Sequence, residues 1–293
     1  MLEGVMLLWF ILAALALLFV AIDIRSTPES PVLKWGFVLL TAYTGVFGAF
    51  LYVLGCREPL PGLHERYTAA RWRQTLGSTM HCVAGDGVGI LAGAVISSLV
   101  GIAGLAEVIA EYVLGFAFGW TIFQALFMRD SAGGSYRKAL ANTFMPELLS
   151  MNFLMAGMVP TVMALRRVVP SANDPTTPNF WFVMSMGLLV GFVIAYPMNW
   201  WLVANHLKHG MMTVRTSAQP AGMAGHSGGA GMEGMTDGTG SGMGGGMADM
   251  AHAASGISMG ASGTTRPPVP VMTLLSFAVL VGGVALAFLL RRS

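Results

Sequence analysis

Long apolar segments dominate this chain and restrict what it can fold into. A helix needs about 20 apolar residues to cross the hydrocarbon core of a bilayer. Segments of that length lie near Leu2–Ile22, Leu33–Leu54, Thr79–Ile102, Leu105–Met128, Thr143–Leu165, Phe180–His206 and Val269–Leu290. Only 10% of the 293 residues are charged, whereas a soluble domain carries about 25%. We therefore predict an all-α, polytopic membrane helical bundle of about seven transmembrane helices, located in the cell inner (plasma) membrane with the lipid bilayer as its first partner.

Composition divides the chain into five parts. These are 1–55, two N-terminal transmembrane helices; 56–76, an amphipathic connection; 77–215, a four-helix membrane core; 216–268, a Gly/Met/His linker; and 269–293, a C-terminal transmembrane helix. The linker lacks the apolar bulk needed to offset the entropy of ordering it, so we predict that it is disordered. The formal net charge of +2 comes without a basic stripe, and we expect no nucleic-acid partner.

The third apolar segment carries ionisable side chains that a bilayer disfavours. Cys82 and Asp86 are four residues apart and share a helix face, and His81 is adjacent. Each ionisable group at such depth costs about 2.5–3.5 kcal/mol on insertion scales, so it usually faces a partner or a water-filled site. A thiolate and an imidazole suit Cu(I) or Zn(II). The alternatives are a nucleophilic thiol activated by the imidazole and a polar knot that joins neighbouring helices.

No triad or oxyanion-hole pattern accompanies Cys82, so the sequence favours a role other than an enzyme. The glycines on both sides of Asp86 weaken a helix. One hypothesis is a local helix break at this point, which would free backbone carbonyls as in transporters.

Other soft donors fall on the same side of the membrane as His81 when the chain reversals are counted. Met151 lies on the fifth segment, and His206 and His209 follow the sixth. The linker adds seven methionines and two histidines that have nothing to pack against. We therefore expect a copper ion as ligand, with His81, Cys82, Met151, His206 and His209 as metal ligands and Asp86 and Glu147 as supporting or coupling carboxylates.

Two further features keep other functions open. Glu107 and Glu111 are four residues apart near the opposite side, where they suit a proton- or cation-coupled carrier of another solute. Small residues recur at helical spacing on two segments, which is typical of close helix packing; they are Gly85, Gly89, Gly93, Gly115 and Gly119. Such faces also suit a structural or assembly partner of a membrane complex, or a homo-oligomer.

Several motifs of the core resemble one protein family. They are Met80-His81-Cys82-Val83-Ala84-Gly85-Asp86-Gly87, Phe123–Asp130, Pro146–Asn152, and the run from Tyr196 through Asn205-His206-Leu207-Lys208-His209 to Met212. The segment of about residues 77–215 is similar to the bacterial membrane family known as domain of unknown function 4396. The resemblance implies a polytopic membrane protein and brings no activity with it.

Orientation rests on opposing signals. The side that carries His81 has more basic residues, which would place it in the cytoplasm. Arg25, after the first segment, and Arg291-Arg292, after the last, favour the reverse. Because a Met/His linker collects metal best where glutathione does not compete, we expect the linker outside the cell.

Overall fold

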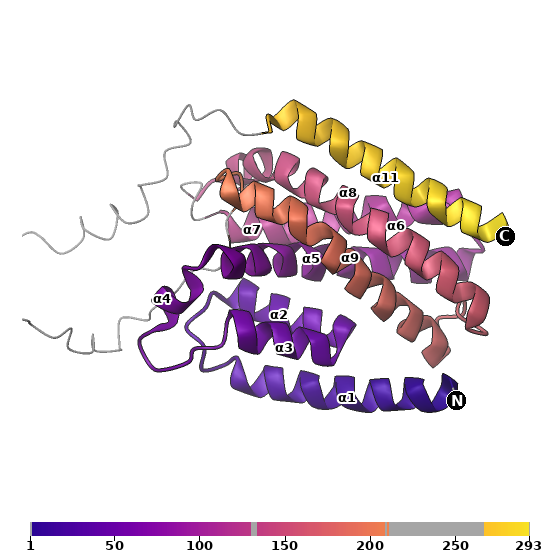
Figure 1. Ribbon diagram of the computed structural model, residues 1–293, viewed down its shortest axis with the longest axis horizontal. Helices are drawn as coiled ribbons and strands as arrows, with labels where there is room; N and C mark the ends of the chain where they lie inside the picture. The colour runs from indigo at the N-terminus through magenta and orange to yellow at the C-terminus, as the bar shows by residue number, and fades with distance from the viewer. Residues whose placement is uncertain (1, 130–133, 209, 211–266, 293) are drawn as a thin grey trace, which may run out of the picture. The chain divides into compact units, whose positions relative to one another are not determined.

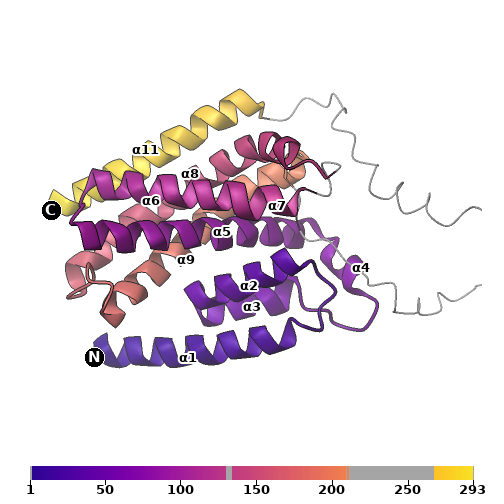
Figure 2. The ribbon, with the colours of Figure 1, turned by 180° about the vertical axis from the view of Figure 1, so that it is seen from behind.

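The computed structural model describes residues 2–129, 134–208, 210 and 267–292, and these form a bundle of helices (Figures 1 and 2). The elements are α1 (Leu2–Asp23), α2 (Pro31–Thr44), α3 (Val46–Gly55), α4 (His64–Thr68), α5 (Arg71–Val100), α6 (Leu105–Phe118), the π-helical segment η1 (Gly119–Gln124), α7 (Ala125–Phe127), α8 (Tyr136–Val168), α9 (Pro178–Ala204) and α11 (Val269–Arg292). In this part of the chain, six helical stretches are long and apolar enough to cross a membrane. The prediction of an all-α polytopic membrane protein is confirmed.

The predicted second span, Leu33–Leu54, is instead a hairpin of two short helices. Gly45 has a φ of 59° and ends α2, so α3 turns back beside α2 (Figure 1). Thr41 and Thr44 donate their hydroxyls to backbone carbonyls one turn earlier in α2, a bond that weakens a helix. The 14 residues of α2 rise only about 21 Å, which is too short to cross. The count of spans is therefore six rather than seven.

The hairpin changes which helix ends lie together. Arg57, just after α3, donates to both carboxylate oxygens of Asp23 at the end of α1, at 2.9 and 3.0 Å, and Tyr52 donates to Asp23 at 2.7 Å. The ends of α1 and α3 therefore lie beside the start of α5. We call this the Lys208 end, because α9 also finishes there. The opposite, Asp174 end holds the α5–α6 turn and the connection 169–177, and the Arg167 guanidinium there donates to the Leu290 carbonyl of α11.

Glycines set the distance between α5 and α6. A Cβ built on Gly89 would overlap the Leu114 carbonyl and lie 2.7 Å from the Gly115 Cα, and one on Gly93 would lie 2.9 Å from the Glu111 Cα. Only glycine permits this approach of the two backbones. The helix runs without interruption from Arg71 to Val100, so the proposed break around Asp86 is wrong.

The predicted amphipathic connection, residues 56–76, holds the single turn α4 and the first residues of α5. The Gly/Met/His linker lies outside the described residues, except for Pro267 and Pro268 before α11.

Candidate functional site

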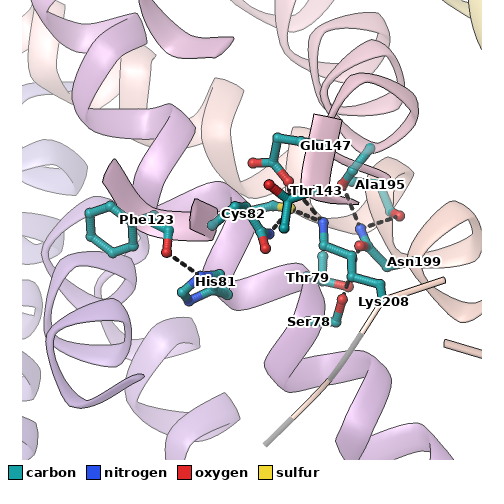
Figure 3. Close-up of polar contacts among 12 residues, drawn as sticks. Ser78, Thr79, His81, Cys82, Phe123, Thr143, Glu147, Ala195, Asn199 and Lys208 are labelled. Carbon is teal, nitrogen blue, oxygen red and sulfur yellow. Dashed lines mark hydrogen bonds and ion pairs between the residues drawn. The ribbon is translucent and has the colours of Figure 1, made fainter. Parts of the chain in front are cut away.

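A buried group of three acidic or thiol side chains lies between α5 and α8. The Cys82 sulfur and a carboxylate oxygen from each of Asp86 and Glu147 all lie within 4.8 Å of one another. Cys82 donates to Glu147 Oε2 at 2.9 Å (Figure 3). All three side chains are fully buried. Cys82 and Asp86 meet here because four residues make about one helical turn, and Glu147 faces them from α8.

Lys208, which lies after α9, completes the group. Its ammonium donates to Glu147 Oε2 at 3.0 Å and also contacts the Cys82 sulfur (Figure 3). Burial by itself would lower the pKa of Lys208, but the facing Cys82 and Glu147 groups reverse that effect and raise the pKa. Together with the ion pair to Glu147, this direction favours the charged form of Lys208. Lys208 is not among the residues that the sequence indicated, because the nearby His206 and His209 are the more usual metal ligands.

The way α9 ends explains how Lys208 reaches inward. His206 has a φ of 57°, and the N–H groups of His206 and Leu207 donate to the Val203 and Leu202 carbonyls at 3.1 and 2.9 Å. This pair of bonds is a Schellman motif with His206 in the left-handed position that glycine usually takes. The chain therefore stops its helix at Asn205 and returns toward the bundle.

Asp86 has no hydrogen-bond donor for either carboxylate oxygen among the described residues. Its neighbour across the seam is Gly119, where a Cβ would overlap the carboxylate. If Asp86 and Glu147 are both ionised, the charge of Lys208 balances only one of them. An unbalanced charge is costly in a buried site, so a proton or a further cation must accompany the pair.

The π-helical segment η1 brings a further polar group to the sulfur. Gln124 Nε2 donates to Cys82 Sγ at 3.4 Å. The extra residue of a π-helix re-aims the side chains of its turn, and such segments are frequent at functional sites. His81 Nε2 is paired with the Phe123 carbonyl at 3.1 Å, and the His81 ring meets the Phe123 ring edge to face (Figure 3). His81 therefore lies beside the group but is turned to η1 rather than to Glu147.

A buried amide holds three helices together next to the site. Asn199 of α9 donates to the Ser150 hydroxyl of α8 at 2.8 Å and accepts from the Ser78 hydroxyl of α5 at 3.2 Å (Figure 3). These bonds fix the register of α5 against α8. They keep Cys82 opposite Glu147, one turn away on each helix.

The remaining predicted ligands do not all gather here. Met151 is buried one turn beyond Glu147, and its methyl group packs at Gly115 beside the Asp86 carbonyl. His206 is exposed and serves as the helix stop described above. His209 lies outside the described residues.

The predicted span Thr143–Leu165 would put Glu147 near the start of its helix, but the structure places it elsewhere. Helix α8 begins earlier, at Tyr136, and Glu147 is fully buried in its interior. The other predicted pair is separate from this group and lies further along the bundle, toward the Asp174 end. Glu107 accepts from Arg166 at 2.7 Å, and Glu111 is buried next to them.

In the described part of the chain, six helices are long and apolar enough to cross a membrane, and a buried group of ionisable side chains lies within their bundle. These features define the class of this molecule, a polytopic α-helical membrane protein with a polar site inside its bundle. Residues 71–208 match the family described as "Domain of unknown function (DUF4396)", and this part of the chain belongs to that family. The match begins at the first residue of α5 and ends at Lys208, so it contains the whole site. No curated protein and no solved structure matches the chain.

Proposed function

We propose that this membrane protein binds a thiophilic transition-metal cation, with copper as the first candidate, at Cys82, Asp86 and Glu147. The observation that carries the proposal is the convergence of one thiol and two carboxylates within 4.8 Å in a fully buried site. A thiolate gives such a site its preference for soft ions. Membrane interiors hold ionisable groups at a cost, which favours a functional reason for three of them together.

Lys208 acts in this proposal as a built-in counter-ion. Its ammonium occupies the position between Cys82 and Glu147 that a metal ion would need. Without a metal the ammonium would balance Glu147. A bound cation would take the place of the ammonium, and the Cys82 thiol would release its proton to become a thiolate ligand. Lys208 follows the turn at His206 and lies outside α9, so its displacement would leave the helix intact.

A Cu(I) competition titration with a chromophoric chelator tests this proposal on the purified full chain. We expect Cys82→Ala and Glu147→Gln to weaken binding by at least about tenfold, because even partners of metal ligands are worth about 10–100-fold. Lys138→Met is the matched control, since this lysine is exposed on the helix that carries Glu147. Equal affinity in wild type, Cys82→Ala and Glu147→Gln would overturn the site.

A second candidate function is a proton- or cation-coupled carrier of another solute. It is favoured by Glu111, a buried carboxylate near the Asp174 end, in addition to Asp86 at the middle of α5. Between them Tyr112 donates to Asn152 at 2.6 Å, and Asn152 donates to Ser276 at 3.0 Å. This candidate predicts that Glu111→Gln abolishes transport while Cu(I) binding is unchanged. Glu65→Gln, at an exposed glutamate of α4, is the control.

For localisation we propose the plasma membrane with the Lys208 end in the cytoplasm. The described residues place ten basic side chains at that end and four at the other. The first set is Arg25, Lys34, Arg57, Arg66, Arg71, Arg73, Arg129, Arg137, Lys138 and Lys208; the second is Arg166, Arg167, Arg291 and Arg292. Because Arg25 and Lys34 change ends with the hairpin, the positive-inside rule opposes the expected outside linker more strongly than the sequence alone did.

A further inference from the structure

A second group of metal-binding side chains lies at the base of the hairpin, outside the residues that match the family. Glu29 comes from the connection between α1 and α2, Cys56 directly follows α3, and His64 is the first residue of α4. One ligand atom from each lies within 4.8 Å of the others. All three residues are buried, with exposures of 4%, 0% and 0%.

We propose that Glu29, Cys56 and His64 form a second transition-metal site, which takes a borderline divalent cation of the kind represented by Zn²⁺. Sulfur, imidazole nitrogen and carboxylate oxygen are the three donor types that zinc uses in proteins. The site goes beyond the function proposed for Cys82, and neither site depends on the other.

The spacing of the donors is compatible with a bridging ion, although His64 and Glu29 already lie at the distance of an ion pair. His64 Nε2 lies 3.7 Å from Glu29 Oε1, which is too long for a hydrogen bond. Two ligands of one tetrahedral zinc ion lie roughly 3.3–3.6 Å apart, since each bond is about 2.0–2.2 Å long. A shift of a few tenths of an ångström therefore lets an ion bridge the two side chains. His64 Nε2 also pairs with the Cys56 carbonyl at 3.0 Å, and it would exchange this bond for the metal.

Metal binding at this site would release a proton, since the Cys56 thiol must become a thiolate to bind an ion. A bound divalent ion would remove that proton and supply positive charge beside the buried Glu29 carboxylate.

The ion would act as a clamp for the hairpin. The three ligands join the connection after α1 to the end of α3 and the beginning of α4. The hairpin packs on α1 and α5, and the ion would add a link at its base. Thr27 and Tyr52, whose hydroxyls lie 2.8 Å apart, join the same connections nearby.

Cobalt spectroscopy on the full chain provides a test that separates the two sites. The chain contains only two cysteines, Cys56 and Cys82. In a Cys82→Ala background, any sulfur-to-cobalt charge-transfer band after Co²⁺ addition must come from Cys56. We expect this band at about one Co²⁺ per chain, its displacement by Zn²⁺, and its loss in the Cys82→Ala/Cys56→Ser variant.

Two further measurements complete the test. Zn²⁺ retained after gel filtration should fall by one ion per chain in His64→Gln and in Glu29→Gln, compared with the control Glu58→Gln in the connection after α3. Thermal unfolding of the Cys82→Ala chain should rise in temperature with added Zn²⁺, since an ion that binds the folded chain stabilises it. Absence of the charge-transfer band in a folded Cys82→Ala chain overturns the proposal, and this result needs no further variant. This result would leave the separate proposal, that Cys82 binds Cu(I) in the wild-type chain, unaffected.

Discussion

The Lys208 ammonium lies 3.0 Å from Glu147 Oε2 inside the bundle, and both side chains are buried. An ion pair in this position is not a source of large net stability, because desolvation of both charges offsets their attraction. Each charge instead reduces the free-energy cost of burying the other. The pair therefore keeps a carboxylate ionised next to Cys82, ready for a cation that outcompetes the ammonium.

Removal of the Lys208 charge should destabilise the metal-free protein and make its stability more dependent on bound metal. Lys208→Met leaves the Glu147 carboxylate buried without its cation, which costs about 3–5 kcal/mol. We expect the unfolding temperature in detergent to fall without metal and to recover when Cu(I) is added. Lys138→Met should change neither value, since Lys138 is exposed. A Lys208→Met chain that unfolds like wild type would show that the pair is not ionised.

The close approach of α5 and α6 should tolerate no side chain at its centre. Gly119→Ala places a Cβ against the Asp86 carboxylate, and Gly89→Ala places one against the Leu114 carbonyl. Overpacking of this kind costs about 1–3 kcal/mol, and backbone on one side leaves little room to adjust. We expect a lower unfolding temperature for both variants and weaker metal binding for Gly119→Ala in particular. Gly282→Ala, where nothing lies within 4 Å of the added Cβ, is the control.

Much of the core could be predicted from the sequence. Apolar length and chain reversal placed Cys82 and Asp86 on one face of a span and Glu147 on the same side of the membrane. They also separated Glu107 and Glu111 from that group. These features depend on the period of the helix and on the alternation of direction, which are properties that the order of residues determines locally.

The rest depends on contacts that no local pattern contains. The run from Leu33 to Leu54 is as apolar as a true span, and glycine is frequent in membrane helices, so Gly45 alone did not indicate a turn. Lys208 reaches the site through the left-handed conformation of His206, whereas the usual rule favours glycine or asparagine for that position. Glu29, Cys56 and His64 come together only because the hairpin folds back.

We expect the backbone conformation of His206, and not its imidazole, to be what places Lys208 in the site. A residue other than glycine pays roughly 1–2 kcal/mol to adopt the left-handed region. We therefore expect His206→Gly to keep or raise the unfolding temperature and to leave Cu(I) affinity unchanged. His206→Val should lower both, because a β-branched residue resists this conformation and would misplace Lys208. Loss of Cu(I) binding in His206→Gly would instead make the imidazole a ligand, as the sequence first suggested.

The re-entrant hairpin makes a prediction about topology that single cysteines can check. Ser26 and Pro59 are exposed at the Lys208 end, and Asn173 is exposed at the Asp174 end. In intact cells, a membrane-impermeant thiol reagent should label Asn173→Cys but not Ser26→Cys or Pro59→Cys, if the Lys208 end faces the cytoplasm as its basic residues indicate. The native cysteines are both buried, so the unmodified chain gives the background. The relation between Ser26 and Pro59 is the stricter part of the test, because it does not depend on orientation. A continuous span over residues 33–54 would put these two positions on opposite sides of the membrane, and opposite labelling would exclude the hairpin together with the metal site at its base.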